Sequence, residues 1–128
     1  MSDKNVNILV VDDDEATRIY VAKILSLRNW RVDLAEDGPT SLGLVQRQAY
    51  DVVLLDYRMP GMDGAELCRR IREIQPGIRE VFLTGYPSID TVYPAMEAGA
   101  DHVLAKPVDP AELLQVIDEE LAWAVANA

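Results

Sequence analysis

Cysteine is nearly absent from this chain, because Cys68 is the only one among 128 residues. A single cysteine cannot form an internal disulfide. Long hydrophobic runs are also missing, since no apolar segment approaches the length of a membrane span. The polar start, MSDKNVN, has no hydrophobic stretch of the kind that signal peptides carry. From these absences we expect a cytoplasmic protein that does not enter a membrane.

Basic residues are scarce: the chain has 12 Lys and Arg but 22 Asp and Glu, which gives a formal net charge of −10. Such an acidic domain repels nucleic-acid phosphates, so we expect no direct binding of nucleic acid. The charge suits a cation or the basic surface of a partner. Hydrophobic residues make up 49% of the sequence, which excludes a disordered chain. The length suits one compact domain over residues 1–128.

Short apolar runs predict five β-strands. Most of these runs contain almost only Ile, Val and Leu, as expected of parallel strands that helices cover on both faces. The run VDLAE alternates apolar and polar residues, which predicts an edge strand. The predicted strands are 7–11, 32–36, 52–55, 81–83 and 102–105.

Helix signals follow each predicted strand. Gly38-Pro39 places proline at the first position of a second helix, Asp63 with Glu66 fits a capping box for a third, and a fifth opens at Asp109. A fourth helix is predicted within 88–98. Residues three or four apart define the predicted apolar faces: Ala16, Tyr20, Ile24 and Leu27; Leu42, Val45 and Ala49; Leu67, Ile71 and Ile74; Leu113, Ile117 and Leu121.

The succession of five strand–helix units indicates an α/β fold, (βα)5. Right-handed crossovers between parallel strands predict a doubly wound parallel five-stranded sheet between two helical layers, a three-layer α/β/α arrangement. In such sheets, ligands bind beyond the carboxyl ends of the strands, where the strand order reverses. Polar residues at the strand ends therefore carry most of the functional information.

Polar residues end or follow four of the five predicted strands. Asp12 and Asp13 follow the first strand, Asp56 the third, Thr84 the fourth and Lys106 the fifth. In a parallel sheet all of them lie at one edge. Carboxylates from two strands form an oxygen-rich site for a hard cation such as Mg²⁺. A hydroxyl and an ammonium opposite them can hold a phosphoryl group.

Four motifs lie at the strand ends: the acid pair after the first strand, the segment LLDYRMPGMDG at the third, the hydroxyl after the fourth, and the dipeptide KP after the fifth. With these motifs, this sequence resembles the receiver domain of two-component response regulators. The resemblance covers nearly the whole chain and implies a flavodoxin-like strand order, 2-1-3-4-5. It implies that Asp56 is the phosphoacceptor for a phosphohistidine on a partner histidine kinase or phosphotransfer protein. It also implies that Asp13, Asp12, Asp56 and the Arg58 backbone carbonyl bind Mg²⁺, with Asp12 acting directly or through water.

The same resemblance implies the remaining roles. Thr84 and Lys106 would contact phosphoryl oxygens, the Lys106-Pro107 bond would be cis, and Pro60 and Gly64 would shape the loop after the phosphoacceptor. The signal would leave through the face of the fourth helix, fifth strand and fifth helix. The signal would pass to an output domain, to another protein, or to a second copy of the chain in a homodimer. A domain of this kind is a signalling switch and not an enzyme.

Several residues add to the family pattern or depart from it. Val103 stands where receivers usually carry an aromatic residue that swings inward on phosphorylation, so the usual readout lacks its side chain. Arg58 and Tyr86 stand where they can tune access of water to the phosphoryl group. Pro94 removes a helical N–H and crowds the preceding turn. We therefore predict that the fourth helix starts late, near Thr91, or is distorted before Pro94, and that this weak first turn is the switch.

Two other functions fit parts of the pattern. Asp12-x-Asp14 resembles the motif of haloacid dehalogenase-type phosphatases. In those enzymes a threonine lies two residues after the second acid, whereas Thr17 lies three after Asp14. The second alternative is an interaction module that works without phosphorylation. For Asp14 and Glu15 we prefer a solvated helix start that favours the helix dipole.

Four further residues are predicted to be structural. Cys68 is expected to be a small core residue of the third helix, and His102 a loop or strand-edge residue. Trp30 and Trp123 are expected to pack, with contact to a partner or a further C-terminal segment as the alternative for Trp123.

Overall fold

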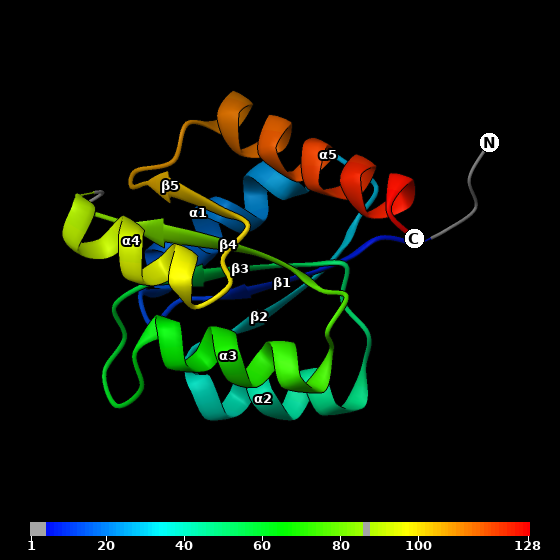
Figure 1. Cartoon of the computed structure of the whole chain (residues 1–128). Helices are drawn as coiled ribbons and strands as arrows, with labels where there is room; N and C mark the ends of the chain where they lie inside the picture. The colour runs from blue at the N-terminus through cyan, green and yellow to red at the C-terminus, as the bar shows by residue number, and fades with distance from the viewer. Residues whose placement is uncertain (1–4, 86–87) are drawn as a thin grey trace.

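The computed structural model describes residues 5–85 and 88–128 of the chain (Figure 1). Strands and helices alternate along this part of the sequence. Their bounds are β1 Asn7–Val11, α1 Glu15–Leu25, β2 Arg31–Ala35, α2 Gly38–Arg47, β3 Val52–Asp56, α3 Gly64–Ile74, β4 Arg79–Thr84, α4 Ile89–Glu97, β5 His102–Ala105 and α5 Pro110–Ala126.

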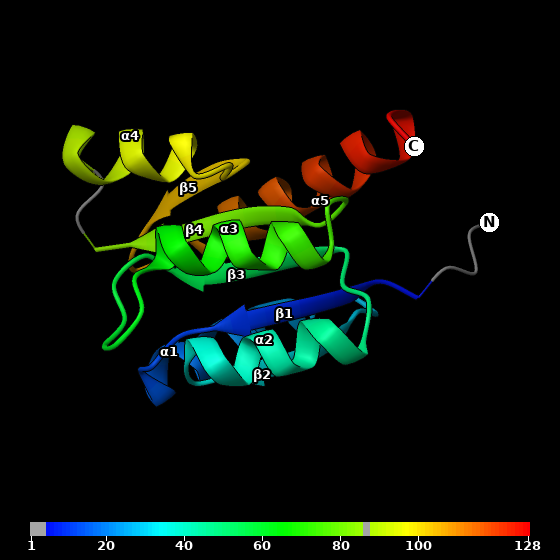
Figure 2. The same ribbon diagram turned by 60° about the horizontal axis from the view of Figure 1, so that its bottom comes forward.

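The five strands form one parallel sheet in the order β2-β1-β3-β4-β5. Helices cover both faces, with α1 and α5 on one side and α2, α3 and α4 on the other (Figures 1 and 2). The predicted three-layer fold and its strand order are therefore confirmed. The strand predicted as an edge from its alternation, β2, lies at an edge of the sheet.

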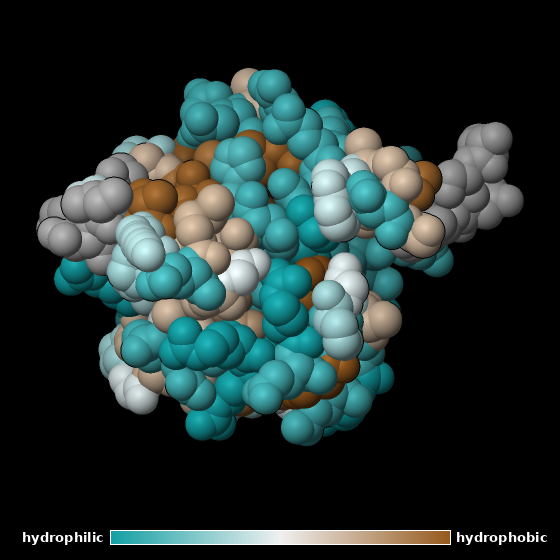
Figure 3. Space-filling view, in the orientation of Figure 1, coloured by the Kyte–Doolittle hydropathy of each residue, from teal (hydrophilic) through white to brown (hydrophobic). Residues whose placement is uncertain are grey.

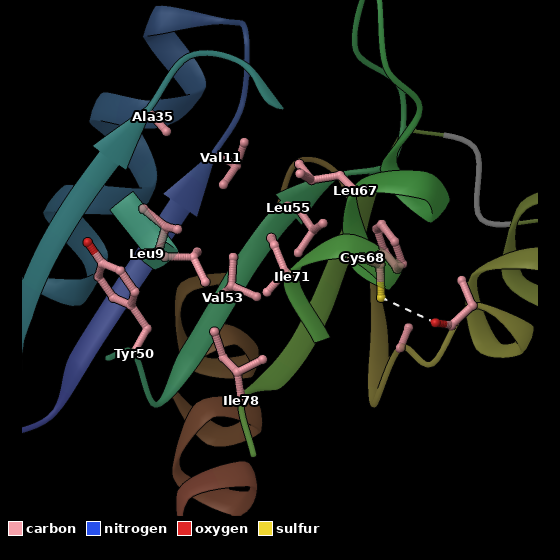
Figure 4. Close-up of a cluster of buried hydrophobic side chains, with 14 of the residues drawn as sticks. Leu9, Val11, Ala35, Tyr50, Val53, Leu55, Leu67, Cys68, Ile71 and Ile78 are labelled. Atoms are coloured by element: carbon pink, nitrogen blue, oxygen red, sulfur yellow. Dashed lines mark hydrogen bonds between the residues drawn. The ribbon is translucent and has the colours of Figure 1, made fainter. Parts of the chain in front are cut away.

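Each face of the sheet has its own hydrophobic cluster. Figure 4 shows the cluster beneath α3, which contains Leu9 and Leu55 from the strands and Leu67 and Cys68 from the helix. Cys68 is fully buried, and its Sγ lies 3.6 Å from the carbonyl oxygen of Ala98. Its predicted core role is confirmed. In the described parts of the chain, no helix has both the length and the apolar character that crossing a membrane requires.

The strand interiors agree with the apolar runs, but some ends do not. β1 and β5 have the predicted bounds, while β3 extends to Asp56 and β2 is shifted by one residue. β4 begins at Arg79, two residues earlier than predicted, because its ladder with β3 pairs Arg79 with Val52 and Glu80 with Val53. Charged residues thus occupy a buried strand that the hydrophobic pattern alone does not reveal.

Aspartate side chains begin four of the five helices. Each N-cap carboxylate accepts a hydrogen bond from the backbone N–H three residues later, which satisfies a donor that has no partner within the helix. The predicted cap of α3 is confirmed. The capping residues are Asp14, Asp37, Asp63 and Asp109.

The apolar face predicted for α1 is wrong in part. Ile24 is buried as expected, but Tyr20 and Leu27 are 42% and 69% exposed. The helix ends at Leu25, so Leu27 lies beyond it, and the buried side is formed by Val21, Ile24 and Leu25. The face predicted for α5 is confirmed at Leu113 and Ile117, with Leu121 partly buried, whereas Ala49 and Ile74 are exposed at or beyond the ends of α2 and α3.

The predicted late start of α4 is also wrong. The helix runs from Ile89 to Glu97 with Ser88 as its N-cap residue and Pro94 inside it. The Ser88 N–H donates to Thr91 Oγ1 at 3.2 Å, and the Thr91 hydroxyl donates back to the Ser88 carbonyl at 3.1 Å. This local cap holds the first turn before the proline is reached, which explains why the helix begins early.

Candidate functional site

The carboxyl ends of four strands bring the predicted site residues to one edge of the sheet. Asp56 ends β3 and Thr84 ends β4, while Asp12 follows β1 and Lys106 follows β5. The ladders pair Asp56 with Leu83 and Thr84 with Ala105, so neighbouring strands end within one residue of each other. Figure 1 shows the strand arrows pointing to this common edge.

Three carboxylates converge at this edge. Oxygen atoms of Asp12, Asp13 and Asp56 lie within 4.8 Å of one another. Asp12 is fully buried, Asp56 is 8% exposed and Asp13 is exposed to solvent. Like charges at this separation repel, so the arrangement favours a cation among them. An all-oxygen donor set of this kind fits a hard divalent cation.

Lys106 places a positive charge beside two of these carboxylates. Its Nζ lies 2.7 Å from Asp12 Oδ2 and 3.3 Å from Asp56 Oδ1. Burial and the charge of Asp12 raise the pKa of Asp56, and Lys106 acts in the opposite direction. Burial disfavours the ammonium, but the bond to Asp12 and the charge of Asp56 leave the pKa of Lys106 raised. Lys106 is therefore a permanent cation of the site.

Backbone and side-chain donors orient the Asp12 carboxylate. The Asp14 N–H donates to Asp12 Oδ1 at 2.9 Å, while Lys106 holds Oδ2. The Arg18 guanidinium reaches back from α1 to the Asp12 carbonyl at 2.6 Å. Arg18 was not predicted as a site residue, because its position in a helix does not indicate a contact with the end of β1.

Two further predicted residues, Arg58 and Thr84, lie near Asp56. The Arg58 N–H donates to Asp56 Oδ1 at 3.3 Å. Thr84 is 2% exposed, and its carbonyl accepts the Lys106 N–H at 2.7 Å, which ties β4 to β5 at this edge. The Lys106-Pro107 bond is cis, as predicted. Tyr86 lies outside the described residues.

Close packing fixes the chain after Asp56. A Cβ added to Gly64 would lie 2.7 Å from Phe82 Cε1 and 2.9 Å from the Asp56 carbonyl oxygen, so only glycine fits. The Gly64 N–H donates to the Tyr57 carbonyl at 2.9 Å. The Tyr57 and Phe82 rings meet edge to face at 5.4 Å. This packing supports the expected role of Gly64 in shaping the loop, and it also involves Tyr57 and Phe82, which the sequence did not single out.

Val103 lies opposite Phe82 in the β4–β5 ladder. The departure from the family pattern at this position is thus accompanied by a buried aromatic on the neighbouring strand. Phe82 is fully buried, and Val103 packs against the same cluster.

An apolar cavity of about 520 Å³ adjoins the site. It lies between α1 and the connection from β5 to α5, and the Tyr20 hydroxyl donates to the Val108 carbonyl at 3.0 Å across it. The residues that line it are Ala16, Thr17, Tyr20, Val21, Leu83, Lys106, Pro107 and Val108. Tyr20, expected in the core, instead forms part of this surface pocket.

Comparisons with known proteins agree with this geometry. The chain is 38% identical over 122 residues to the transcriptional regulatory protein ZraR of Klebsiella oxytoca, covering 95% of this chain and 28% of that protein. It is 40% identical over 109 residues to the response regulator MprA of Mycobacterium sp. (strain KMS), covering 85% of this chain and 47% of that protein. The chain therefore spans less than half the length of these relatives.

Solved structures give the same result. A CheY-like response regulator receiver domain protein from Methanospirillum hungatei superposes with a TM-score of 0.93 at 30% identity, covering 98% of this chain and 100% of the other. A BeF3-activated DrrB receiver domain gives a TM-score of 0.86 at 33% identity, covering 93% and 99%. The response regulator receiver domain family matches residues 8–118. The chain therefore belongs to the family of response regulator receiver domains.

Proposed function

We propose that Asp56 accepts a phosphoryl group from a phosphohistidine on a partner histidine kinase or phosphotransfer protein, and that Mg²⁺ is required. The position of the Asp56 carboxylate supports this proposal. The Asp56 carboxylate lies at a strand end among two further acids and 3.3 Å from Lys106, at an edge where a phosphoryl group would meet cations. Residues 1–128 form, in this proposal, one cytoplasmic receiver domain that binds neither nucleic acid nor membrane itself.

The proposed chemistry needs an ionised nucleophile and neutralised phosphoryl oxygens. An Asp56 oxygen attacks phosphorus as the phosphorus–nitrogen bond of the phosphohistidine breaks, which leaves an acyl phosphate. When bound, Mg²⁺ would neutralise charge on the phosphoryl oxygens, held by Asp12, Asp13, Asp56 and the Arg58 carbonyl. Lys106 offsets the burial that disfavours ionised Asp56. Attack of water on phosphorus would later release phosphate and reset the domain.

Thr84 and Lys106 have the positions of phosphoryl-binding groups in this scheme. Thr84 ends β4, which pairs with β3 beside Asp56, and Lys106 follows β5, the next strand after β4 in the sheet. The Thr84 carbonyl accepts a hydrogen bond from the Lys106 backbone N–H. A Thr84 hydroxyl drawn toward a phosphoryl oxygen would pull on the connection from β4 to α4. The domain is then a switch that turns over no external substrate beyond its own phosphorylation and dephosphorylation.

The output surface in this proposal is the face of α4, β5 and α5. Tan and brown atoms gather over α4 and between α4 and α5 in Figure 3, whereas the surface over α2 and α3 is largely teal. Tyr93 and Met96 of α4 are 49% and 51% exposed. This apolar surface would contact an output domain, a separate protein or a second copy in a homodimer. The name of ZraR, a transcriptional regulatory protein, suggests a transcriptional output.

Intact-mass spectrometry with acetyl phosphate and Mg²⁺ tests the assignment. The parent should gain one phosphoryl group, and Asp56→Asn should gain none because the amide is not a nucleophile. Asp118→Asn, which changes an exposed acid of α5, is the matched control and should react like the parent. Phosphorylation of the Asp56→Asn protein, or none in the parent, would contradict the proposal, and the second outcome would favour a phosphorylation-independent module.

The phosphatase alternative is disfavoured by the position of Asp14. Its Oδ2 accepts from the Thr17 backbone N–H at 2.9 Å and from the Thr17 hydroxyl at 2.6 Å, so the carboxylate caps α1. A catalytic acid needs that carboxylate facing the phosphoryl group. We expect no turnover of a phosphomonoester.

A further inference from the structure

A second group of charged residues lies at the opposite end of β4 from Thr84. This basal charge cluster consists of Arg72 from α3, Arg79 and Glu80 at the start of β4, Asp101 just before β5, and Glu120 from α5. It joins both helical layers to the β4–β5 edge of the sheet. Nothing in phosphoryl transfer at Asp56 uses these residues.

Glu80 is the most buried member of the cluster, with no exposed surface. Its Oε1 accepts from Arg72 Nε at 2.9 Å and lies 2.7 Å from Arg72 Nη2. Its Oε2 is buried and has no hydrogen-bond partner among the described residues. Against the effect of burial, the nearby Cys68 thiol, which contacts the Ala98 carbonyl oxygen, lowers the pKa of Glu80. A buried carboxylate oxygen without a partner is costly when ionised, and protonation removes that cost.

Arg72 connects Glu80 to the chain between α4 and β5. The same Nη2 donates to the Gly99 carbonyl at 2.6 Å and lies 3.3 Å from Asp101 Oδ2. Gly99 has φ +110, and a Cβ there would lie 3.0 Å from Arg72 Nε, so the guanidinium lies directly against this turn. Arg72 is thus the link between α3 and the connection at residues 98–101, and Glu80 fixes the position of Arg72.

Asp101 bridges the two faces of the sheet. Its Oδ2 accepts the Glu80 N–H at 2.7 Å, and its Oδ1 lies 3.1 Å from Arg79 Nη2. On the other face, Arg79 Nε lies 2.7 Å from Glu120 Oε1 and its guanidinium stacks 3.7 Å from the Trp123 ring. The cluster therefore holds three carboxylates against two guanidiniums.

In the described part of the chain, the charged and titratable groups near Glu80 lie on α3, on β4 and in the α4–β5 connection. Cys68 and Arg72 face it from α3, Asp101 from the α4–β5 connection, and Arg79 is its neighbour on β4. Its ladder partner on β3, Val53, is apolar. On the far side, His102 Nδ1 lies 4.0 Å from Glu120 Oε2. Among residues 5–85 and 88–128, Arg72 is the cation that pairs with Glu80, so the excess negative charge is most readily removed by a proton on this acid.

We propose that Glu80 is a proton-operated latch, whose ionised form holds Arg72 and thereby secures the α4–β5 connection against α3. Protonation weakens the charge-assisted bonds to Arg72 and loosens that connection. Burial raises the pKa of Glu80 to about 7, against the opposing effects of Cys68 and Arg72. The latch responds near neutral pH, and it adds an input to α4 that does not depend on phosphorylation of Asp56.

Carbon-13 NMR of the glutamate side-chain carboxyl carbons tests the proton site directly. The folded parent should show one glutamate carboxyl resonance with a midpoint near pH 7, and the spectrum of Glu80→Gln should lack it. Midpoints below about pH 5.5 for every glutamate of the parent, near the ordinary range of this side chain, would overturn the proposal. This measurement on the parent stands even where the variant folds poorly.

Hydrogen exchange tests the latch itself. Protection factors of the amides at residues 99–101, which include the Asp101 N–H bonded to the Glu80 carbonyl, should fall several-fold in the parent from about pH 8 to about pH 6. Glu80→Gln should show the lower protection at both pH values. Glu120→Gln keeps the Glu80–Arg72 pair, removes the negative charge beside Arg79 and His102, and should retain the pH dependence of the parent. Equal protection of the parent at both pH values, or an unchanged pH dependence in Glu80→Gln, would overturn the latch.

Discussion

Asp56 and Glu80 are buried acids on adjacent strands, and their surroundings give them different chemistry. Burial raises the pKa of both groups. Asp56 lies at the sheet edge beside Asp12 and Lys106, where a metal ion can reach it. Glu80 lies inside the molecule against Arg72, where only a proton can enter without rearrangement. A buried carboxylate thus belongs to the candidate reactive site in one place and to a structural charge cluster in the other.

Glu80 should make the free energy of global unfolding depend on pH, with a sign opposite to that of the local loosening. Unfolding brings this acid into water, whereas loosening only removes the Arg72 charge that lowers its pKa. The native pKa of about 7 exceeds the ordinary value of 4.5, so the native state binds more protons between these values. The contribution of Glu80 is fully present below about pH 4.5 and is lost as pH rises through about 7. Its size is about 3 kcal/mol. Urea unfolding should therefore show Glu80→Gln gaining about 3 kcal/mol relative to the parent over this window. A pH-independent difference between the two proteins would contradict this prediction.

Two glycines should respond in opposite ways to alanine. Gly64→Ala should destabilise by about 1–3 kcal/mol, because its Cβ would meet backbone atoms of Asp56 and Tyr57 at 2.9 Å. Gly43→Ala should stabilise by about 1 kcal/mol, because Gly43 lies within α2 with no atom within 4 Å of an added Cβ. Urea unfolding of both variants checks the pair, and changes of the same sign would be inconsistent with the packing around Asp56.

At the level of helices and strands, the sequence predicted interiors better than ends. Apolar runs located all five strands because helices bury both faces of a parallel sheet. The start of β4 was missed because Arg79 and Glu80 are buried through ion pairs with Glu120 and Arg72. Such pairs form between distant parts of the chain, so no local pattern indicates them.

In α4, local capping outweighs proline. The bonds between Ser88 and Thr91 begin the helix at Ile89, although Pro94 lacks the N–H that would bond to the carbonyl four residues earlier. The weakness predicted from Pro94 therefore lies inside the helix and not at its start. The proposed role of α4 as the moving element is compatible with this placement.

Replacing Pro94 by alanine should stabilise the domain by about 2 kcal/mol. Alanine is about 3 kcal/mol better than proline inside a helix, and the more flexible unfolded chain returns up to about 1 kcal/mol. Pro110→Ala is the control, because Pro110 is at the first turn of α5, where the missing N–H has no helical partner. Thermal unfolding should separate the two variants. A neutral or destabilising Pro94→Ala would mean that α4 is already free of strain at this position.

Across the whole molecule, β4 connects two regions of unbalanced charge. One end carries Thr84 beside three acids and Lys106, and the other carries Glu80 within three acids and two arginines. The first region was predictable from sequence, because the carboxyl ends of parallel strands must meet at one edge. The second was not, because long side chains reach across the sheet from α3 and α5. The chain as a whole carries a formal net charge of −10, so both regions lie in a negative field.

Magnesium should therefore raise the stability of the native state through the first region. A ligand at 100 times its Kd that binds only the folded protein adds about 2.7 kcal/mol, which for a domain of this size raises Tm on the order of 10 °C. Asp13→Ala removes a carboxylate of the cluster and should lose most of this rise. Glu15→Ala removes a neighbouring exposed acid outside the cluster and should keep it. Calorimetry with and without Mg²⁺ measures both, and equal rises in the parent and Asp13→Ala would place the cation elsewhere on the acidic surface.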